Sequence, residues 1–407
     1  MKKLYRILSY VPPILTGFIL GFLVAKYVYD PFGLAAPERL TPDEIKADFT
    51  PFWEVYDFVQ TRYFEQPLDN TKLVEGAING MLATLGDPHT RYLPPADEES
   101  AREEMDGEFE GIGAFVEEVD GNITVVAPIE GSPAEAAGLK PGDILREADG
   151  VALTGMAVEE AAALVRGPRG TAVLLLIERD GELFEKEIIR DRITIPSVRG
   201  EMLENNIAYV RLSRFGNNSA EEIKAMLEEL DANNAAGLIL DLRSNPGGGL
   251  ETAVDIADQF LDEGTILVER FGNGEEILYD SKDAGLAQTV PMVVLIDEGS
   301  ASASEVLAGA IRDRGRGVLI GQTSFGKGTV QTWLGLSNGG GVRITIARWL
   351  TPNKKWVHGE GLEPDYFIPL PETTEDGAEF VDTQLQAAVD FLLGKPVTSV
   401  PPDTTGE

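Results

Sequence analysis

The second half of the chain, from residue 193 to about 370, alternates apolar strands with amphipathic helices. This βαβα order predicts an α/β domain in which helices pack on a sheet. The strongly apolar strands 237–243 and 292–297 indicate burial on both faces of that sheet. The other expected strands span 206–213, 318–321, 329–336 and 341–350, and the helices span 219–232, 250–262, 304–313 and 383–393.

The remaining chain divides into segments that differ in their pattern of apolar and polar residues. We predict five parts: a membrane anchor at 1–30, a linker with a helical region at 31–106, a β-rich module at 107–192, the α/β core with a terminal helix at 193–395, and a disordered tail at 396–407. The helical assignment rests on aromatic and aliphatic residues that recur every three to four positions between residues 49 and 82. The β-rich module contains short alternating strands and one helical patch.

Composition excludes several classes of function. The chain has 34 Lys and Arg against 68 Asp and Glu, a formal charge of −34, which makes nucleic acid an unfavourable partner. It has no cysteine, so disulfides, thiolate metal sites and a cysteine nucleophile are excluded. Its two histidines are His89 and His358, and a catalytic histidine would have to be one of them.

Residues 7–29 are apolar except for Lys26, and about 20 such residues span a bilayer as a helix. Lys2, Lys3 and Arg6 precede this stretch, so the positive-inside tendency predicts a cytoplasmic N-terminus and an exported remainder. We therefore expect a single-pass protein of the cytoplasmic membrane. A cleaved signal peptide and a buried core helix stay open as alternatives.

A glycine-rich turn follows the buried strand at 237–243. Gly247, Gly248 and Gly249 allow a sharp backbone turn and leave N–H groups available to a ligand. One interpretation is part of an anion or oxyanion pocket, and the other is a tight connection between strand and helix.

A serine-rich turn, 299–305, lies between a strand and a helix. Small residues at such a turn can present a hydroxyl beside N–H groups of a helix N-terminus, as an activated serine requires. The alternative is a simple helix cap by Ser302 or Ser304, with Glu305 in the first turn.

The segment 321–331 nearly matches the phosphate-loop pattern, but Gly328 stands where that pattern needs a hydroxyl. A strand-like sequence follows it, so we expect no helix to complete a phosphate cradle. Glycines on both sides of Lys327 favour close backbone packing, which would desolvate its amine and lower its pKa. A neutral lysine can be the general base for a serine, and the amide oxygen of Gln331 could orient it. A surface lysine and a Ser–His arrangement with His89 or His358 stay open.

Several of these motifs occur together and in order. The serine-rich turn with its helix, the lysine segment 25 residues after Ser302, and the segments at 241–250, 86–93 and 359–365 resemble the carboxyl-terminal processing (tail-specific) serine proteases. The resemblance covers roughly residues 45–395. It implies a Ser–Lys protease with Ser302 as nucleophile, Lys327 as general base and Gln331 supporting it. The oxyanion hole would be formed by the Ala303 N–H and the N–H of one glycine of 247–249, of which Gly248 is the favoured choice. Ser300 and Ser304 are then structural neighbours.

The β-rich module resembles a PDZ domain, through its first strand segment and the longer segment at 132–150. Such modules bind an extended peptide by strand addition and hold its terminal carboxylate in backbone N–H groups. The resemblance assigns that loop to Gly111, Ile112, Gly113 and Ala114.

These readings predict an extracytoplasmic serine endopeptidase that recognises proteins with apolar C-termini and needs no metal or organic cofactor. The rivals are a catalytically silent, membrane-tethered PDZ scaffold and an ATPase. Self-association through the terminal helices and the acidic tail stays open.

Overall fold

The computed structural model describes residues 42–95, 97–98, 107–129, 131–282, 285–370 and 381–400. Its internal contacts divide the chain into two units, 1–74 and 75–407. The predicted anchor, the linker at 31–40 and residues 401–407 of the predicted tail lie outside the described residues. Within the described part, no helix combines the length and the hydropathy that crossing a membrane would require.

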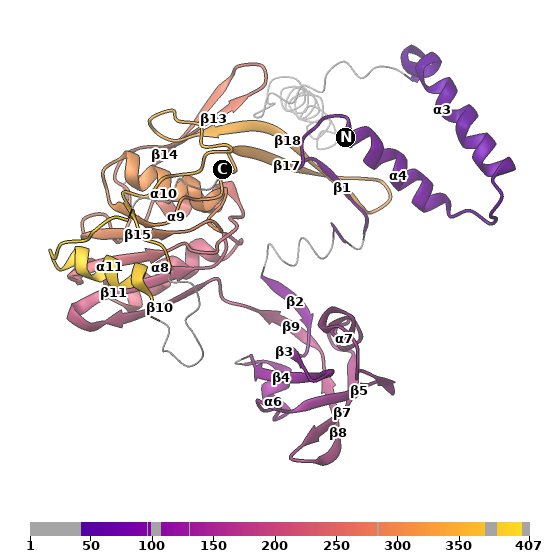
Figure 1. Ribbon diagram of the computed structural model, residues 1–407, viewed down its shortest axis with the longest axis horizontal. Helices are drawn as coiled ribbons and strands as arrows, with labels where there is room; N and C mark the ends of the chain where they lie inside the picture. The colour runs from indigo at the N-terminus through magenta and orange to yellow at the C-terminus, as the bar shows by residue number, and fades with distance from the viewer. Residues whose placement is uncertain are drawn as a thin grey trace, which may run out of the picture. The chain divides into compact units, whose positions relative to one another are not determined.

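Two helices form the predicted helical region, α3 (Pro42–Arg62) and α4 (Asn70–Ala83) (Figure 1). They span the residues whose three- and four-residue spacing predicted them. Phe52 and Trp53 of α3 make an edge-to-face pair with ring centroids 5.1 Å apart, yet both side chains remain exposed. Within the first unit, the Tyr56 hydroxyl of α3 donates to the Asn70 side chain at the start of α4, 3.2 Å away.

A short strand interrupts the predicted helical region. Residues Arg91–Leu93 form strand β1, which pairs antiparallel with β18 (Gly341–Leu350). The Thr345 N–H also donates to the Thr90 hydroxyl, 3.1 Å away. A three-residue strand is too short to show alternation, and its partner lies some 250 positions along the chain. The prediction of helix up to residue 106 was therefore wrong for this segment.

The β-rich module contains an antiparallel sheet of order β3-β4-β5-β7-β8, with β6 paired to β5. Strand β3 lies at the edge of this sheet. A separate two-stranded ladder pairs β2 with β9. The elements are β2 (Glu108–Gly111), β3 (Ala114–Val119), β4 (Asn122–Pro128), α6 (Pro133–Ala136), β5 (Ile144–Ala148), β6 (Val151–Ala152), α7 (Val158–Val165), β7 (Ala172–Arg179), β8 (Glu182–Ile189) and β9 (Asp191–Thr194).

The α/β core contains the predicted sheet, with strand order β10-β11-β12-β15-β16-β19. All neighbours are parallel except β10 and β11. The strands are β10 (Val198–Leu203), β11 (Ile207–Leu212), β12 (Gly237–Asp241), β15 (Met292–Ile296), β16 (Val318–Gly321) and β19 (Tyr366–Phe367). The helices are α8 (Ser219–Glu229), α9 (Leu250–Ala257), α10 (Ala303–Asp313) and α11 (Thr383–Leu392), with short 3₁₀ turns at Glu204–Asn206 and Ala232–Asn234.

Alternation along the central strands fills two cores. Leu238 and Leu240 of β12 pack with α8, α9 and α10, whereas Ile239 packs on the opposite face with α11. Strand β12 and strand β15 are buried at every position. The prediction of a sheet covered on both faces is confirmed.

A second sheet has the order β1-β18-β13-β14, with β17 also paired to β18. Its other strands are β13 (Gly264–Phe271), β14 (Glu276–Ser281) and β17 (Thr329–Gly335). Strands β10, β13 and β14 were not predicted from the sequence. Strand β17 begins directly after Lys327-Gly328, so no helix follows the near phosphate loop, as predicted.

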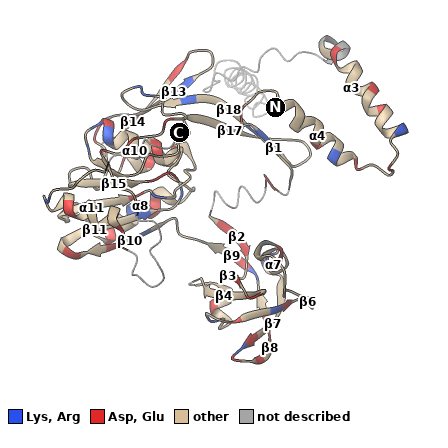
Figure 2. Ribbon diagram, in the orientation of Figure 1, with Lys and Arg blue, Asp and Glu red and all other residues tan. Residues whose placement is uncertain are grey.

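A buried ion-pair network anchors α11 to the sheet. The Arg243 guanidinium contacts Asp241 at 2.7 Å and Asp382, the N-cap of α11, at 2.8 Å. Beyond α11 the chain stays ordered further than predicted, because the Val400 N–H donates to the Phe367 carbonyl, 2.9 Å away. The predicted disorder from residue 396 was therefore wrong for residues up to 400. Acidic residues occur along the ribbon of both the module and the core (Figure 2).

Candidate active site

A cavity of about 390 Å³ at the end of the central sheet brings together the motifs that the sequence singled out. The glycine turn follows β12, the serine turn follows β15, and the lysine segment follows β16. These strands are neighbours in the sheet, so their carboxyl ends lie at one edge, where α/β proteins bind ligands. The predicted residues that line the cavity are Gly247, Gly248, Gly249, Ser302, Ala303, Lys327 and Gln331.

Ser302 is the N-cap of α10 and has an unusual backbone conformation, with φ 55° and ψ −112°. A non-glycine residue at positive φ is strained and persists only where the surrounding structure holds it. The neighbouring serines hold this turn, because the Ser300 hydroxyl donates to the Leu242 carbonyl and the Ser304 hydroxyl to the Asn245 carbonyl, at 2.8 and 2.9 Å. Ser300 and Ser304 are thus structural neighbours, as predicted.

The glycine turn packs directly against the serine turn. A Cβ atom on Gly247 would lie 2.9 Å from Ser302 Cβ and 3.0 Å from Ala303 N. On Gly248, at φ +148°, it would lie 2.2 Å from the Phe215 carbonyl oxygen. Neither position has room for a side chain.

The three glycine N–H groups differ in their partners. That of Gly247 donates to the Asn245 side chain and that of Gly249 to the Phe215 carbonyl, each at 2.9 Å. Within the described residues, neither the Gly248 nor the Ala303 N–H donates to a protein acceptor. Both residues line the cavity, so these are the N–H groups available for a ligand oxygen.

The carboxylate of Glu305 is completely buried and connects the serine and lysine segments. Its Oε2 accepts the N–H of Ser302 and the N–H of Lys327, both at 2.8 Å. Its Oε1 accepts the Ser324 hydroxyl at 2.6 Å and the Gly326 N–H at 2.7 Å. From the sequence, Glu305 was assigned only to the first turn of a helix capped by Ser302 or Ser304. Its contact with the lysine segment could not be predicted, because these hydrogen-bond partners lie 19 to 22 positions further along the chain.

Lys327 has a depressed pKa. Burial, together with the charges of Arg343 and Arg91, lowers the pKa of its amine from 10.5 to about 8, although Glu305 and Asp87 act in the opposite direction. Burial was the cause predicted from the flanking glycines. A substantial fraction of Lys327 is therefore neutral near pH 8, as a general base requires.

Gln331 lines the cavity, and its side-chain amide forms hydrogen bonds with residues other than Lys327. Its Nε2 donates to the Thr329 hydroxyl at 2.8 Å, and its Oε1 accepts from Arg343 at 3.2 Å. The two histidines lie near each other, with ring centroids 6.3 Å apart, and His358 Nδ1 accepts the Gly328 N–H at 3.4 Å. Neither histidine lines the cavity.

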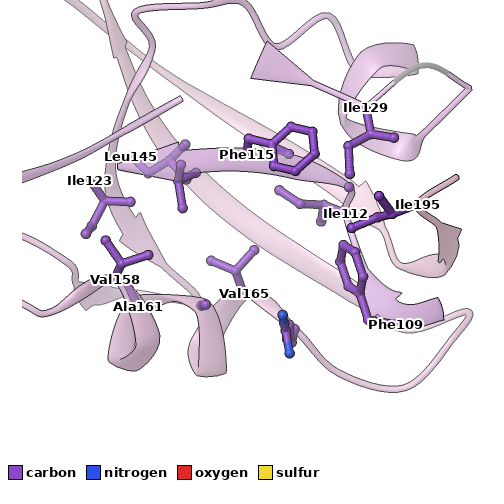
Figure 3. Close-up of a pocket in the computed structure, with 15 residues that line it drawn as sticks. Phe109, Ile112, Phe115, Ile123, Ile129, Leu145, Val158, Ala161, Val165 and Ile195 are labelled. Carbon is purple, nitrogen blue, oxygen red and sulfur yellow. The ribbon is translucent and has the colours of Figure 1, made fainter. Parts of the chain in front are cut away.

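The β-rich module contains an apolar pocket of about 240 Å³ between the edge strand β3 and helix α7 (Figure 3). Of the four residues predicted for its loop, Ile112, Gly113 and Ala114 line the pocket, whereas Gly111 pairs with Asp191 at the end of β2. Arg166 also lines it, with its guanidinium carbon 4.9 Å from the centre of the Phe109 ring. The other apolar lining residues are Phe115, Val116, Ile123, Ile129, Leu145, Val158, Ala161, Ala162, Val165 and Ile195.

Comparison with known protein families matches three parts of the chain. Residues 206–368 match peptidase family S41, and residues 124–179 match a PDZ domain. Residues 36–98 match the N-terminal domain of the activating protease CtpB. The three matches follow the order of the helical region, the β-rich module and the α/β core.

Curated relatives cover most of the chain. The carboxy-terminal processing protease CtpA of Bacillus subtilis is 41% identical over 78% of this chain and 68% of its own length. The carboxy-terminal-processing protease of Bartonella bacilliformis is 38% identical over 79% of this chain and 75% of its own length. A putative S41 protease from Bacteroides fragilis shares the fold, with a TM-score of 0.53 over 82% of this chain and 91% of its own, at 16% identity. The chain therefore belongs to peptidase family S41, with the PDZ-containing carboxy-terminal processing serine proteases.

Proposed function

We propose that the chain cleaves proteins near their C-termini with a Ser302–Lys327 dyad. The observation that carries this proposal is the shared cavity, in which Ser302 at a strained turn and the desolvated Lys327 are tied to one buried carboxylate, that of Glu305. Neutral Lys327 would accept the Ser302 hydroxyl proton as Ser302 Oγ attacks the peptide carbonyl carbon. The lysinium would then protonate the leaving amine, and water would hydrolyse the acyl-enzyme.

The oxyanion of the tetrahedral intermediate needs donors that are preorganised and otherwise unpaired. The Ala303 and Gly248 N–H groups meet both conditions, and Ala303 is the first residue of α10, where the helix dipole favours negative charge. Gln331 would support Lys327 through the network that it shares with Arg343 and Thr329.

Ser302→Ala and Lys327→Ala should each abolish cleavage of an unstructured protein substrate, because they remove the nucleophile and the base. Cleavage is followed by gel electrophoresis and mass spectrometry of the fragments, and circular dichroism checks that each variant is folded. Ser337→Ala and Lys355→Ala, at exposed positions outside the cavity, are the controls and should cleave normally. Full turnover by either dyad variant would refute the assignment. Peptide binding without cleavage by the unmodified chain would instead indicate a scaffold.

The pH dependence should follow the Lys327 pKa of about 8. The base acts in its deprotonated form, so activity should rise with pH and level off above the pKa. We expect log(kcat/KM) for a neutral peptide to increase by about one per pH unit below pH 8. A profile that is flat from pH 6 to 9 would exclude Lys327 as the general base.

We propose that the PDZ-like module selects substrates through their apolar C-termini. The edge of β3 is available for strand addition, and the pocket beside it is apolar. Phe115→Glu places a charge at a lining residue that is 43% exposed, so the fold tolerates it. It should weaken binding of a labelled peptide with an apolar C-terminus by about tenfold or more, measured by fluorescence anisotropy. Val126→Glu, at an exposed position on the same module outside the pocket, is the control. Equal affinities would argue against the pocket.

We also propose that residues 1–30 anchor the protein in the cytoplasmic membrane, with the catalytic part outside. The support is the apolar stretch 7–29 and the basic residues before it. Deleting residues 1–30 should move the protein from the membrane fraction to the soluble fraction. In addition, protease added from outside should degrade the full chain on cells whose outer layers have been removed but whose cytoplasmic membrane is intact. Membrane association of the deleted form would contradict the anchor.

A further inference from the structure

The catalytic cavity is basic in a strongly acidic protein. Its 19 lining residues include four basic side chains, Arg91, Arg214, Lys327 and Arg343, and no Asp or Glu. The whole chain has twice as many acidic as basic residues. Charge of this sign around a cavity favours an anionic group on the molecule that enters it.

Two of these cations are placed directly opposite each other. Arg91 of β1 and Arg343 of β18 are antiparallel partners in the second sheet. Like charges at such positions destabilise a sheet. Burial and the charge of Arg91 accordingly lower the pKa of Arg343. The fold thus maintains an unfavourable pair of like charges on the wall of this cavity.

In the part of the chain that the structure describes, the positive charges of Arg91 and Arg343 are not balanced by a nearby carboxylate. Within the described residues, no carboxylate oxygen lies within 4 Å of either guanidinium, and Arg343 Nε is buried without a hydrogen-bond partner. Arg343 Nη2 donates to the Gln331 amide oxygen, a neutral acceptor, at 3.2 Å. Its guanidinium carbon also lies 5.7 Å from the centre of the Trp333 ring.

The acidic groups that act on Lys327 already have other partners. Asp87 and Glu305 are the carboxylates whose charges reach Lys327. Glu305 accepts four hydrogen bonds from the serine and lysine segments. Asp87 accepts the His89 N–H at 2.9 Å and the Thr90 hydroxyl at 2.7 Å. Neither lines the cavity, so a carboxylate inside it would have to come from the substrate.

We propose that Arg91 and Arg343 form a carboxylate-binding subsite in the catalytic cavity and make the enzyme prefer peptides with a carboxylate near the scissile bond. The inference rests on the proposed function of Ser302 and Lys327 and names a substrate class for that site. A guanidinium presents parallel N–H donors that match a carboxylate, and such charge-assisted hydrogen bonds are the stronger kind. The carboxylate can be an Asp or Glu side chain, or the terminal carboxylate of a short chain bound in the cavity.

Matched peptides distinguish the two sources. In one series of paired peptides, either Glu or Gln is placed at a single position, and this position is varied from the third residue before the scissile bond to the third residue after it. Each peptide is made with a free and with an amidated C-terminus. The kcat/KM ratio between paired peptides is measured for the unmodified protein and for Arg91→Gln and Arg343→Gln. We expect a preference of about tenfold or more for the carboxylate form at one position, and its loss in both variants. A side-chain source appears as a Glu-over-Gln ratio in amidated peptides, and a terminal source as a free-over-amidated ratio only.

Charge reversal and a neighbouring control sharpen the test. Arg343→Glu should reverse the preference, so that a peptide with Lys at that position is cleaved faster than the Glu peptide. Arg348→Gln is the control, because Arg348 lies on the same strand, over the Trp356 ring and outside the cavity. It should keep the unmodified ratio.

The outcomes separate this inference from the proposed function. Arginines that act only through the pKa of Lys327 would shift the pH profile equally for both peptides and leave the ratio unchanged. That result, or equal cleavage of paired peptides by the unmodified protein, would overturn the subsite while leaving the dyad intact. Failure to cleave any peptide would instead refute the dyad.

Discussion

One buried carboxylate holds the candidate active site together. Glu305 accepts the backbone N–H groups of Ser302 and Lys327 on a single oxygen, and two further donors from the lysine segment on the other. Charge-assisted hydrogen bonds to backbone donors are strong and directional, and a buried carboxylate without them would be costly. The Ser302 turn and the Lys327 segment therefore share one anchor, and movement of either would leave that carboxylate short of donors.

This anchor sets the two segments opposite the glycine turn, which approaches so closely that side chains are excluded at Gly247 and Gly248. The same three loops leave strands β12, β15 and β16, which are neighbours in the sheet. The site thus depends on strand order as much as on local sequence. Burial at the end of this sheet also lowers the pKa of Lys327, so the position of its amine and its lowered pKa have one structural origin.

Much of the architecture could be predicted from the sequence because the signals are local. The alternation of β11, α8, β12, α9, β15, α10 and β16 shows directly in the apolar pattern, and β17 was recognised as a strand from its Val, Thr and Trp residues. Close glycines around Lys327 correctly indicated desolvation. The turns that contain Ser302 and Lys327 were singled out because each follows a predicted strand, and the family resemblance then implied their roles as nucleophile and general base.

Long-range partners could not be predicted in this way. The three-residue strand at Arg91 is too short to indicate that it pairs with the strand of Arg343. Likewise, the position of Glu305 in the first turn of a helix does not indicate that its carboxylate binds a later segment. The choice among three successive glycines requires knowing which N–H groups the protein itself uses. The net charge of −34 was a misleading average, because the ionisable side chains that line the candidate active-site cavity are all cationic.

The ladder between β2 and β9 has a consequence for how the chain is built. Glu108 pairs with Thr194 and Gly111 with Asp191, so the two ends of the PDZ-like module run side by side. The module is therefore inserted through a two-stranded stem, and its two ends do not lie far apart as they would in a linear series of domains. A short flexible bridge could replace it without breaking any strand of the catalytic sheet, and a module of different peptide preference could be grafted onto the same stem.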